Sequence, residues 1–461
     1  MRISRLLPAV LAAALLPALS LGTILFQRRW HLSSADAGRS VALDADTGYA
    51  VGAGTRFGGT DCGAAMILVD SLGDTVAVRS IAGLDTGAGF LCRVNDGGHV
   101  IVGSHDSLLV FAQKFDATGD SVWTYSAATR GLVFDAIGTA DGGCLIAGRI
   151  PDSLAHFGLV KLHADGSQAW IHYYADYRVD WSAARGVAQT KDGGFILCGD
   201  AHDYNGTYAR FLRTDSAGQQ SWNELYVGPV DPSLRDICET SDGGFLSVGW
   251  EYDTLQSHNA VYIVRIDTGG AILRTHNLSP GGVGTQAMAM DKTGDGGYIV
   301  AATIDWGDSS RVWLIRLDAN SDTTWTTVLP GTGKERAADV RQTADGGYVI
   351  AGTSDSAGGS VLLIRTNPQG QLPIIEKSPT VPDRVALSII PNPARGVVRI
   401  ETSVPMEAAA SLKLYDATGK LVRTLTGAAR RVLPVANMAT GTYFLRLEST
   451  EGMATQKLLV E

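Results

Sequence analysis

Short apolar segments recur along most of the chain at a nearly constant interval, and each follows the same polar turn. The segments end in small residues, as in Tyr348-Val349-Ile350-Ala351-Gly352. Glycine readily supplies the positive φ of a tight hairpin, so each copy predicts a turn followed by a strand. The turn tripeptide Asp-Gly-Gly begins at Asp96, Asp141, Asp192, Asp242, Asp295 and Asp345, and a weaker copy begins at Asp46.

Each of these seven copies contains further strand-like segments. A second apolar segment follows about 20 residues later, as in Leu314-Ile315-Arg316-Leu317-Asp318, and another precedes the next turn, as in residues 338–343. Four short strands in about 50 residues are typical of one β-propeller blade, which cannot bury both of its faces alone. The pattern therefore predicts an all-β fold, a seven-bladed β-propeller over residues 23–377. We expect a strand near Trp30 to complete the last blade.

The last 80 or so residues follow a different pattern. A proline-containing linker over residues 378–384 precedes them. Alternating apolar residues such as Leu412 and Leu414, and Tyr443 and Leu445, indicate half-buried strands. We predict a small C-terminal immunoglobulin-like β-sandwich over residues 385–461.

The N-terminus predicts export. A basic start with Arg2 and Arg5 precedes an apolar run, and small residues near Ser20 suit cleavage, so residues 1–22 are interpreted as a signal peptide. Because the apolar stretch continues to Phe26, a retained membrane anchor is the alternative. After cleavage, no other segment is apolar for long enough to form a transmembrane helix.

Composition narrows the possible functions. Of 461 residues, 55 are glycine and 18% are charged, and the net charge is −9. This charge argues against a nucleic-acid partner, which would require a basic face. The five cysteines form no CxxC pair, and an odd number cannot complete a disulfide framework. We interpret them as small buried residues, and we predict no cofactor and no metal site.

The candidate ligand-binding residues lie in the connections that vary between copies. In a propeller these connections share one face, whereas the repeated turns share the other. Aromatic rings and carboxylates there would suit a glycan or a protein ligand; alternatively, they cap the ends of their own blades. The candidates are Tyr177, Asp180, Trp181, His202, Asp203, Tyr204, Trp250, Glu251, Tyr252, Asp253 and Trp306.

No catalytic residue is assigned, because no nucleophile, phosphate-binding or dinucleotide motif is present. The leading hypothesis is therefore a binding or adhesion module. The alternative is a polysaccharide hydrolase or lyase that uses Asp180, Asp203, Glu251 and Asp253 as acid and base. A purely structural surface protein is a further possibility.

Two resemblances concern the repeats. The Asp-Gly-Gly-Tyr pattern is similar to repeats in secreted proteins of Bacteroidetes-like bacteria, whose propellers mostly lack an assigned activity. The segment Leu317–Trp325 resembles both the tryptophan-docking repeats of quinone dehydrogenases and the Asp box of sialidases. A quinone-dependent dehydrogenase would require eight blades and adjacent cysteines, which this chain lacks. The resemblance implies a structural, blade-docking role for Trp123, Trp170, Trp222 and Trp325.

The turn in that segment also has oxygen ligands at alternate positions, as in calcium loops. Asp318, Asn320 and Asp322 are thus a weak calcium candidate, because other copies carry glycine or glutamine in this turn.

The C-terminal module resembles the type A sorting domain of the type IX secretion system. The shared motifs are Pro391-Asn392-Pro393, the Tyr-Asp-x-x-Gly-Lys hairpin from Tyr415, and the strand that begins at Gly441. The terminal Glu461 departs from the basic ending that the family more often has, which leaves open a related immunoglobulin-like domain that is not sorted in this way. The resemblance implies a partner in the outer-membrane secretion machinery, and an extracellular or outer-membrane surface location after periplasmic transit.

Overall fold

The computed structural model describes most of the chain. The described residues are 25–33, 35–44, 48–57, 61–82, 89–105, 109–150, 156–226, 231–254, 257–280, 282–331, 333–355, 359–372, 387–402, 411–416, 420–425, 432–449 and 452–461. The chain divides into two compact units, Met1–Pro373 and Ile374–Glu461. The predicted signal peptide and linker lie outside the described residues. Within the described part, no helix is long and apolar enough to cross a membrane.

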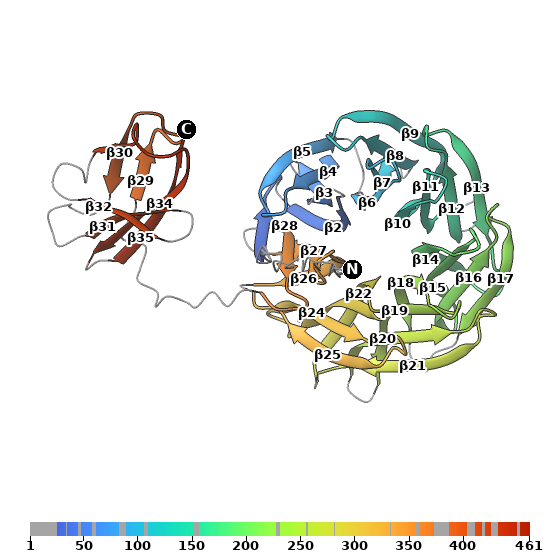
Figure 1. Cartoon of the computed structure of the whole chain (residues 1–461). Helices are drawn as coiled ribbons and strands as arrows, with labels where there is room; N and C mark the ends of the chain where they lie inside the picture. Colours follow the sequence, from blue (N-terminus) through green and yellow to red (C-terminus); the bar gives the residue numbers. More distant parts are fainter. Residues whose placement is uncertain are drawn as a thin grey trace, which may run out of the picture. The chain divides into compact units, whose positions relative to one another are not determined.

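The described residues of the first unit form seven four-stranded antiparallel sheets that follow one another around a ring (Figure 1). Within each sheet, consecutive strands are neighbours, and the first strand lies innermost. Sheets 1 to 3 consist of β2 (Ala35–Leu43), β3 (Tyr49–Phe57), β4 (Asp61–Val69) and β5 (Thr75–Ala82); β6 (Phe90–Arg93), β7 (His99–His105), β8 (Leu109–Phe115) and β9 (Ser121–Arg130); and β10 (Leu132–Gly138), β11 (Cys144–Arg149), β12 (Phe157–Leu162) and β13 (Gln168–Tyr174).

The remaining sheets continue the ring. Sheets 4 to 7 consist of β14 (Trp181–Gln189), β15 (Phe195–Asp203), β16 (Gly206–Thr214) and β17 (Gln220–Tyr226); β18 (Ser233–Glu239), β19 (Phe245–Asp253), β20 (His258–Ile266) and β21 (Ile272–Leu278); β22 (Gly284–Lys292), β23 (Tyr298–Asp305), β24 (Ser310–Leu317) and β25 (Thr323–Val328); and β26 (Glu335–Gln342), β27 (Tyr348–Ser354), β28 (Ser360–Thr366) and β1 (Phe26–Trp30).

The apolar core of the ring lies between sheets rather than within them. Each of seven buried clusters draws its side chains from two neighbouring sheets, including the pair formed by sheets 7 and 1. For example, Leu145 and Phe157 of sheet 3 share one cluster with Phe195 of sheet 4. Each sheet therefore buries both of its faces against its neighbours, as the repeat pattern predicts.

The Asp-Gly-Gly turns have the predicted geometry and an additional anchor. The first glycine of each has a positive φ, for example 82° at Gly142, and the aspartate accepts the N–H of the second glycine, as Asp141 does from Gly143 at 3.1 Å. Each aspartate also forms an ion pair with a lysine or arginine on the third strand of its own sheet. The pairs are Asp96–Lys114, Asp141–Lys161, Asp192–Arg213, Asp242–Arg265, Asp295–Arg316 and Asp345–Arg365.

The N-terminal strand closes the ring, which confirms that prediction. Strand β1 pairs antiparallel with β28 and so becomes the outermost strand of sheet 7. It also contacts sheet 1, because Arg28 donates to the carbonyl of Gly73 at 2.9 Å and Trp30 donates to Thr75 at 2.8 Å. The two ends of the repeat array are thereby joined by hydrogen bonds as well as by apolar contact.

A second column of contacts links the outer rims of neighbouring sheets. The Trp123 indole N–H donates to the carbonyl of Ala164, and Trp222 donates to Thr268, both at 3.0 Å. Each ring lies against a positive-φ glycine of the next sheet's turn, so that a Cβ at Gly166 would be 2.5 Å from the Trp123 ring. Trp170 and Trp325 meet Gly218 and Gly370 in the same way. The docking role of these tryptophans remains a prediction that stability measurements test.

Four cysteines lie within the described residues whose side chains are placed. Cys92, Cys144 and Cys198 are buried and Cys238 is half-buried, and all four are free thiols. Cys92 and Cys144 contact each other at 3.7 Å inside the cluster shared by sheets 2 and 3. They pack as small buried residues, as the sequence indicates.

The second unit contains two sheets around one apolar core. The sheets are β29 (Leu387–Ile390), β30 (Val397–Thr402) and β33 (Val432–Pro434), and β32 (Leu421–Leu425), β31 (Ser411–Asp416), β34 (Gly441–Ser449) and β35 (Gly452–Val460). The Asn392 side chain donates to the carbonyl of Lys457 at 2.7 Å and accepts the N–H of Leu459 at 2.8 Å. The terminal Glu461 pairs with Arg395 at 3.0 Å. The Pro-Asn-Pro motif thus holds the last strand.

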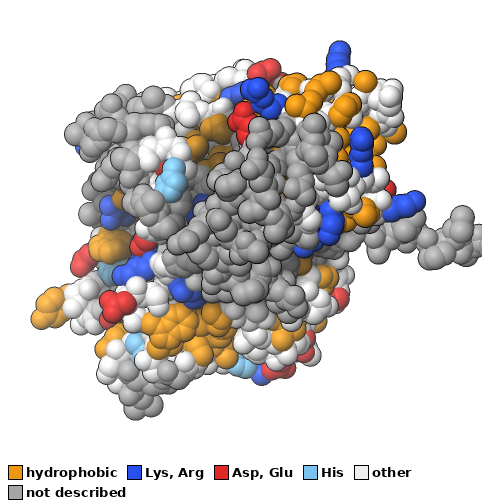
Figure 2. All heavy atoms as spheres, turned by 90° about the vertical axis from the view of Figure 1, so that its left-hand side faces the viewer, with side chains coloured by type: hydrophobic (Ala, Val, Ile, Leu, Met, Phe, Trp, Pro, Cys, Tyr) orange, Lys and Arg blue, Asp and Glu red, His pale blue; other side chains and the backbone are white. Residues whose placement is uncertain are grey.

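The described surface is mixed in character. In the view of Figure 2, basic and acidic side chains are scattered singly among hydrophobic and uncharged ones. This distribution is consistent with the moderate net charge of −9.

The glycine turns allow a matched stability test. Gly166 and Gly296 have φ of 84° and 87°, but a Cβ at Gly296 would meet nothing within 4 Å. We expect Gly296→Ala to lower the free energy of unfolding by about 1–2 kcal/mol, the cost of left-handed backbone for a residue with a Cβ. Gly166→Ala should cost about 1–3 kcal/mol more, because it also overpacks the Trp123 contact. Denaturant unfolding of both variants measures the difference, and equal losses would contradict the docking role of Trp123.

Candidate functional site

The predicted ligand residues share one side of the ring. Asp180 and Trp181 stand where β14 begins, whereas His202 and Asp203 end β15 and Tyr204 follows it. Because adjacent strands are antiparallel, the start of a first strand and the end of a second strand lie at the same edge. The remaining candidates occupy equivalent places: Tyr177 precedes β14, Trp250, Glu251, Tyr252 and Asp253 end β19, and Trp306 follows β23.

Two of these residues form the centre of a hydrogen-bonded group on sheet 4. The rings of Trp181 and His202 are stacked, with centroids 3.8 Å apart, and the His202 carbonyl accepts the N–H of Asp180. The His202 Nε2 lies 3.2 Å from Oδ2 of Asp200. The other carboxylate oxygen, Oδ1, accepts a hydrogen bond from Arg185 at 2.8 Å. Burial opposes ionisation of Asp200, but these hydrogen bonds outweigh it and hold the pKa of the carboxyl at about 2.

Other predicted residues are not drawn into this group. Tyr177 and Tyr204 are 99% and 98% exposed. Asp203 binds its own turn, because it accepts from the Tyr208 hydroxyl at 2.9 Å and from the N–H of Asn205 at 2.7 Å. Trp306 is 47% exposed and Tyr252 is 40% exposed. These exposed rings are available to a ligand, whereas the Asp203 carboxylate already has partners.

Glu251 is the most enclosed of the predicted carboxylates. Its side chain is buried, and it accepts a hydrogen bond from the amide of Asn277 in the same sheet. Burial raises the pKa of Glu251, and repulsion from Asp253 adds to the shift.

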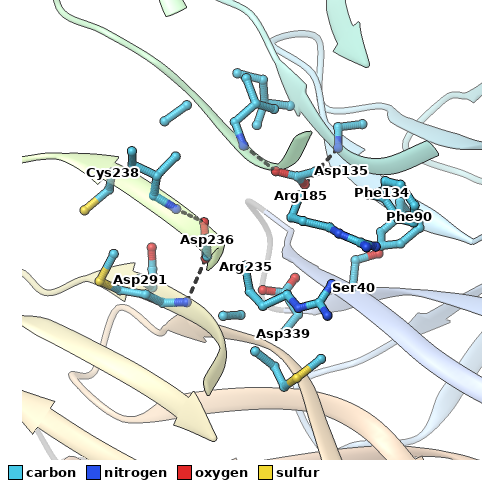
Figure 3. A pocket seen from close by; sticks show the side chains of 18 of the residues that line it. Ser40, Phe90, Phe134, Asp135, Arg185, Arg235, Asp236, Cys238, Asp291 and Asp339 are labelled. Carbon is cyan, nitrogen blue, oxygen red and sulfur yellow. Dashed lines mark hydrogen bonds between the residues drawn. The ribbon is translucent and has the colours of Figure 1, made fainter. Parts of the chain in front are cut away.

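A cavity of about 530 Å³ opens at the centre of the ring, lined by first strands from all seven sheets (Figure 3). In six of these first strands the pairing register shifts at the same place. Such a β-bulge leaves one extra residue out of the ladder and redirects its side chain. The six extra residues all line the cavity, and they are Arg39, Phe134, Arg185, Arg235, Met288 and Ala338.

The three bulge arginines differ in their partners. Arg185 pairs with Asp200 and lies over the Phe134 ring, with its guanidinium carbon 4.1 Å from the centroid. Arg235 lies 4.0 Å above the Trp250 ring, and its Nε is buried without a hydrogen-bond partner among the described residues. Much of the Arg39 surface faces the cavity, yet the enclosing ring still lowers its pKa by desolvation. Burial lowers the pKa of Arg235 to about 10, so both side chains stay cationic at neutral pH.

A layer of carboxylates lies next to the arginines. Asp135 accepts the N–H of Val187 from the next sheet at 2.9 Å, Asp236 that of Met290 at 2.7 Å, and Asp339 that of Val41 at 2.8 Å. Asp291 accepts the N–H of Gln342 at 2.7 Å in the same manner. These side chains connect sheets 3, 5, 6 and 7 to the sheets that follow them at the inner edge.

Burial dominates the acidity of this layer. It raises the pKa of Asp135 to about 8, with repulsion from Asp236 as the second cause, and it raises the pKa of Asp236 to about 6. Arg341 forms an ion pair with Asp339 at 2.8 Å and opposes the rise at each of the four carboxyls.

These inner residues were not predicted from the sequence, although the sequence contains a signal for them. Asp135, Asp236 and Asp339 each stand six positions before the aspartate of an Asp-Gly-Gly turn. An arginine stands seven positions before Asp192, Asp242 and the weaker Asp46 copy. Aligning the repeats column by column would have placed both sets on the innermost strand.

The weak calcium candidate has partners within its own turn and the neighbouring sheet. Asp318 accepts the N–H groups of Asn320 and Asp322, both at 2.8 Å. The Asp322 carboxylate pairs with Arg274. A calcium ion would have to displace these bonds. Across the described residues, no three His, Cys, Asp or Glu side chains are grouped to hold a metal ion.

Comparison with known families identifies the C-terminal module. Residues 388–461 match the model of the secretion system C-terminal sorting domain. The chain therefore carries a type IX sorting domain, which indicates export to the cell surface or the extracellular space and implies an interaction with the secretion machinery. No curated protein matches the sequence of this chain.

Solved structures resemble the chain at low identity, and some of them have propeller-like folds. A protein of unknown function from Dyadobacter fermentans is 13% identical over 74% of this chain and 98% of its own, with a TM-score of 0.45. The β-propeller domain of the Trilobed protease from Pyrococcus furiosus is 11% identical over 72% and 94%, with a TM-score of 0.44. PorZ, a surface component of the type-IX secretion system of Porphyromonas gingivalis, is 10% identical over 90% and 69%, with a TM-score of 0.37.

The carboxylate layer predicts a pH dependence of stability. The pKa of Asp135 is raised from about 3.9 in an unfolded chain to about 8 in the folded protein. Its contribution to stability is therefore complete below about pH 4 and is lost as the pH rises toward 8. Asp135→Asn should flatten the fall in the unfolding free energy over this range.

Asp141 provides a control of opposite sign. Lys161 and Thr139 hold the pKa of its carboxyl at about 2 against partial desolvation, so its contribution is present above about pH 4 and lost at lower pH. Asp141→Asn should destabilise the protein at neutral pH and reduce its acid sensitivity. Denaturant unfolding across the pH range measures the unfolding free energy of both variants. If this free energy falls with pH as steeply in Asp135→Asn as in the unaltered protein, the raised pKa of Asp135 is contradicted.

Proposed function

We propose that this chain is an exported binding module, a seven-bladed propeller followed by an immunoglobulin-like sorting sandwich. The ligand, a glycan or a protein segment, binds on the side of the ring where the variable connections of blades 4 and 5 meet the central cavity. The sorting domain delivers the propeller to the cell surface or the medium.

One observation carries this proposal more than any other. The Trp250 ring lies against Arg235, and the Trp181–His202 stack reaches Arg185 through Asp200, so both aromatic groups adjoin arginines that line the cavity on adjacent blades. Ser233 of blade 5 also lies 3.3 Å from Asp200 of blade 4. Aromatic planes beside charged hydrogen-bonding groups are the usual composition of binding hot spots.

A polysaccharide hydrolase is the second candidate. The raised pKa of Glu251 beside Asp253 is the feature expected of a general acid with a neighbouring carboxylate. However, the Glu251 side chain is only 4% exposed and is held by Asn277, so a substrate would need this residue to become accessible. Binding without turnover is favoured for this reason.

The binding proposal predicts a loss of affinity in two variants. Trp181→Ala and Trp250→Ala should each weaken ligand binding by about tenfold or more, because each removes an aromatic plane at the opening. The exported protein is first screened on an array of glycans and peptides, and titration calorimetry then compares the variants.

Phe444→Ala is the matched control, since Phe444 is an exposed aromatic residue of the other unit. Unchanged affinity in both tryptophan variants would remove the site from this opening. Release of sugars from a polysaccharide that is abolished in Glu251→Gln would favour the hydrolase instead.

A further inference from the structure

Two arginines that line the cavity form no ion pair with a carboxylate of the described residues. Arg39 forms no hydrogen bond or ion pair with a described residue, and Arg235 has only the face of Trp250 and the more distant charge of Asp200. A buried cationic donor is costly without an acceptor, and the Nε of Arg235 is such a donor among the described residues, whereas Arg39 is exposed to the cavity. Both side chains are placed by β-bulges that direct them into the cavity.

From this arrangement we infer that the ligand is an acidic polysaccharide whose uronate carboxylate binds in the central cavity, which Arg39, Arg185 and Arg235 line. This inference rests on the proposed binding function and names its ligand class. The guanidinium group presents a planar fork of donors that matches a carboxylate. The Arg185 side chain is already oriented by Asp200 and Phe134, so ligand binding does not have to order it.

The neighbouring acidic layer does not supply the missing partner. Asp135 accepts N–H groups from Ala136 and Val187, and Asp236 accepts those of Ile237 and Met290. Asp339 is paired with Arg341 in addition to its backbone bonds. The carboxylates thus bind the inner strands and Arg341, and they leave Arg39 and Arg235 to an external anion.

A sugar fits the surroundings better than an acidic peptide does. Sugar rings present apolar C–H faces to aromatic planes, and each uronate adds one carboxylate. The variable side of the ring has both kinds of partner, because the half-buried Trp250 lies against Arg235 and the half-buried Trp181 and the almost fully exposed Tyr177 and Tyr204 lie on the same side of blade 4. A chain of uronates can therefore stack on the rim while one carboxylate reaches the arginines.

The experiment measures binding of an oligogalacturonate to the full exported protein by titration calorimetry. We expect binding that weakens at high salt, and a loss of about tenfold or more in Arg39→Ala and in Arg235→Ala. Arg39→Ala carries little folding risk, because much of that side chain faces the cavity. Arg423→Ala makes the same charge change at an exposed position of the other unit and should bind as the unaltered protein does.

Each alternative result has a distinct meaning. Equal binding of poly-glutamate would overturn the polysaccharide assignment in favour of an acidic peptide. A neutral oligoglucan serves as the uncharged control ligand. If the protein binds this oligoglucan, and both arginine variants bind it with unchanged affinity, the anion site is overturned while the binding function stands. Failure to bind any glycan or peptide on the array would overturn both.

Discussion

Each sheet of the ring depends on its two neighbours for burial of its faces. The seven apolar clusters all span a boundary between sheets, so a single sheet has no core of its own. Such an arrangement is stable only if the last boundary is also made, between sheets 7 and 1. Strand β1 makes it by placing Phe26 in the cluster that joins Val349 to Val51. The chain therefore has to fold its N-terminal strand against its most distant repeat, a contact of high sequence separation.

The outer rim repeats a second, more specific constraint. Where the outermost strand of a sheet carries an aromatic ring, the facing turn of the next sheet has a glycine. A Cβ at that glycine would overlap the ring. Two sheets have no aromatic ring at this place. In sheet 1, Leu68 and Arg79 lie against Gly119 of the next turn instead. Sheet 5 has Arg274 in the place that Trp222 occupies in sheet 4, and the facing turn has Ser321 with φ of 70° instead of glycine. Arg274 reaches the Asn320 carbonyl and Asp322 in that turn, so an ion pair replaces the ring contact.

The repeated features of the fold were predictable from sequence, whereas the site was predictable only in part. Turn glycines and apolar segments recur in every copy, so their period predicts four strands per unit and the closing role of the strand that contains Trp30. The side of the ring that carries Trp181 and His202 also follows from strand direction alone. Their stacking depends on the cross-strand register that pairs Trp181 with His202, and the inward direction of Arg235 depends on a bulge that a strict alternation of strand residues does not encode. The use of Asp203 within its own turn likewise depends on local hydrogen bonds to Asn205 and Tyr208.

The innermost strands separate the residues that the fold requires from those that it does not. A first strand is the inner edge of its sheet, so the N–H groups that it does not use within the sheet need other acceptors. Asp135, Asp236 and Asp339 supply these acceptors to the next sheet, and the elevated pKa of Asp135 and Asp236 reflects the cost of holding carboxyl groups there. Arg39 and Arg235 cannot satisfy these N–H groups, because a guanidinium group donates hydrogen bonds and does not accept them. Arg39 is exposed to the cavity, and the Nε of Arg235 is buried without a partner among the described residues, so we assign both arginines to the proposed ligand rather than to the stability of the fold.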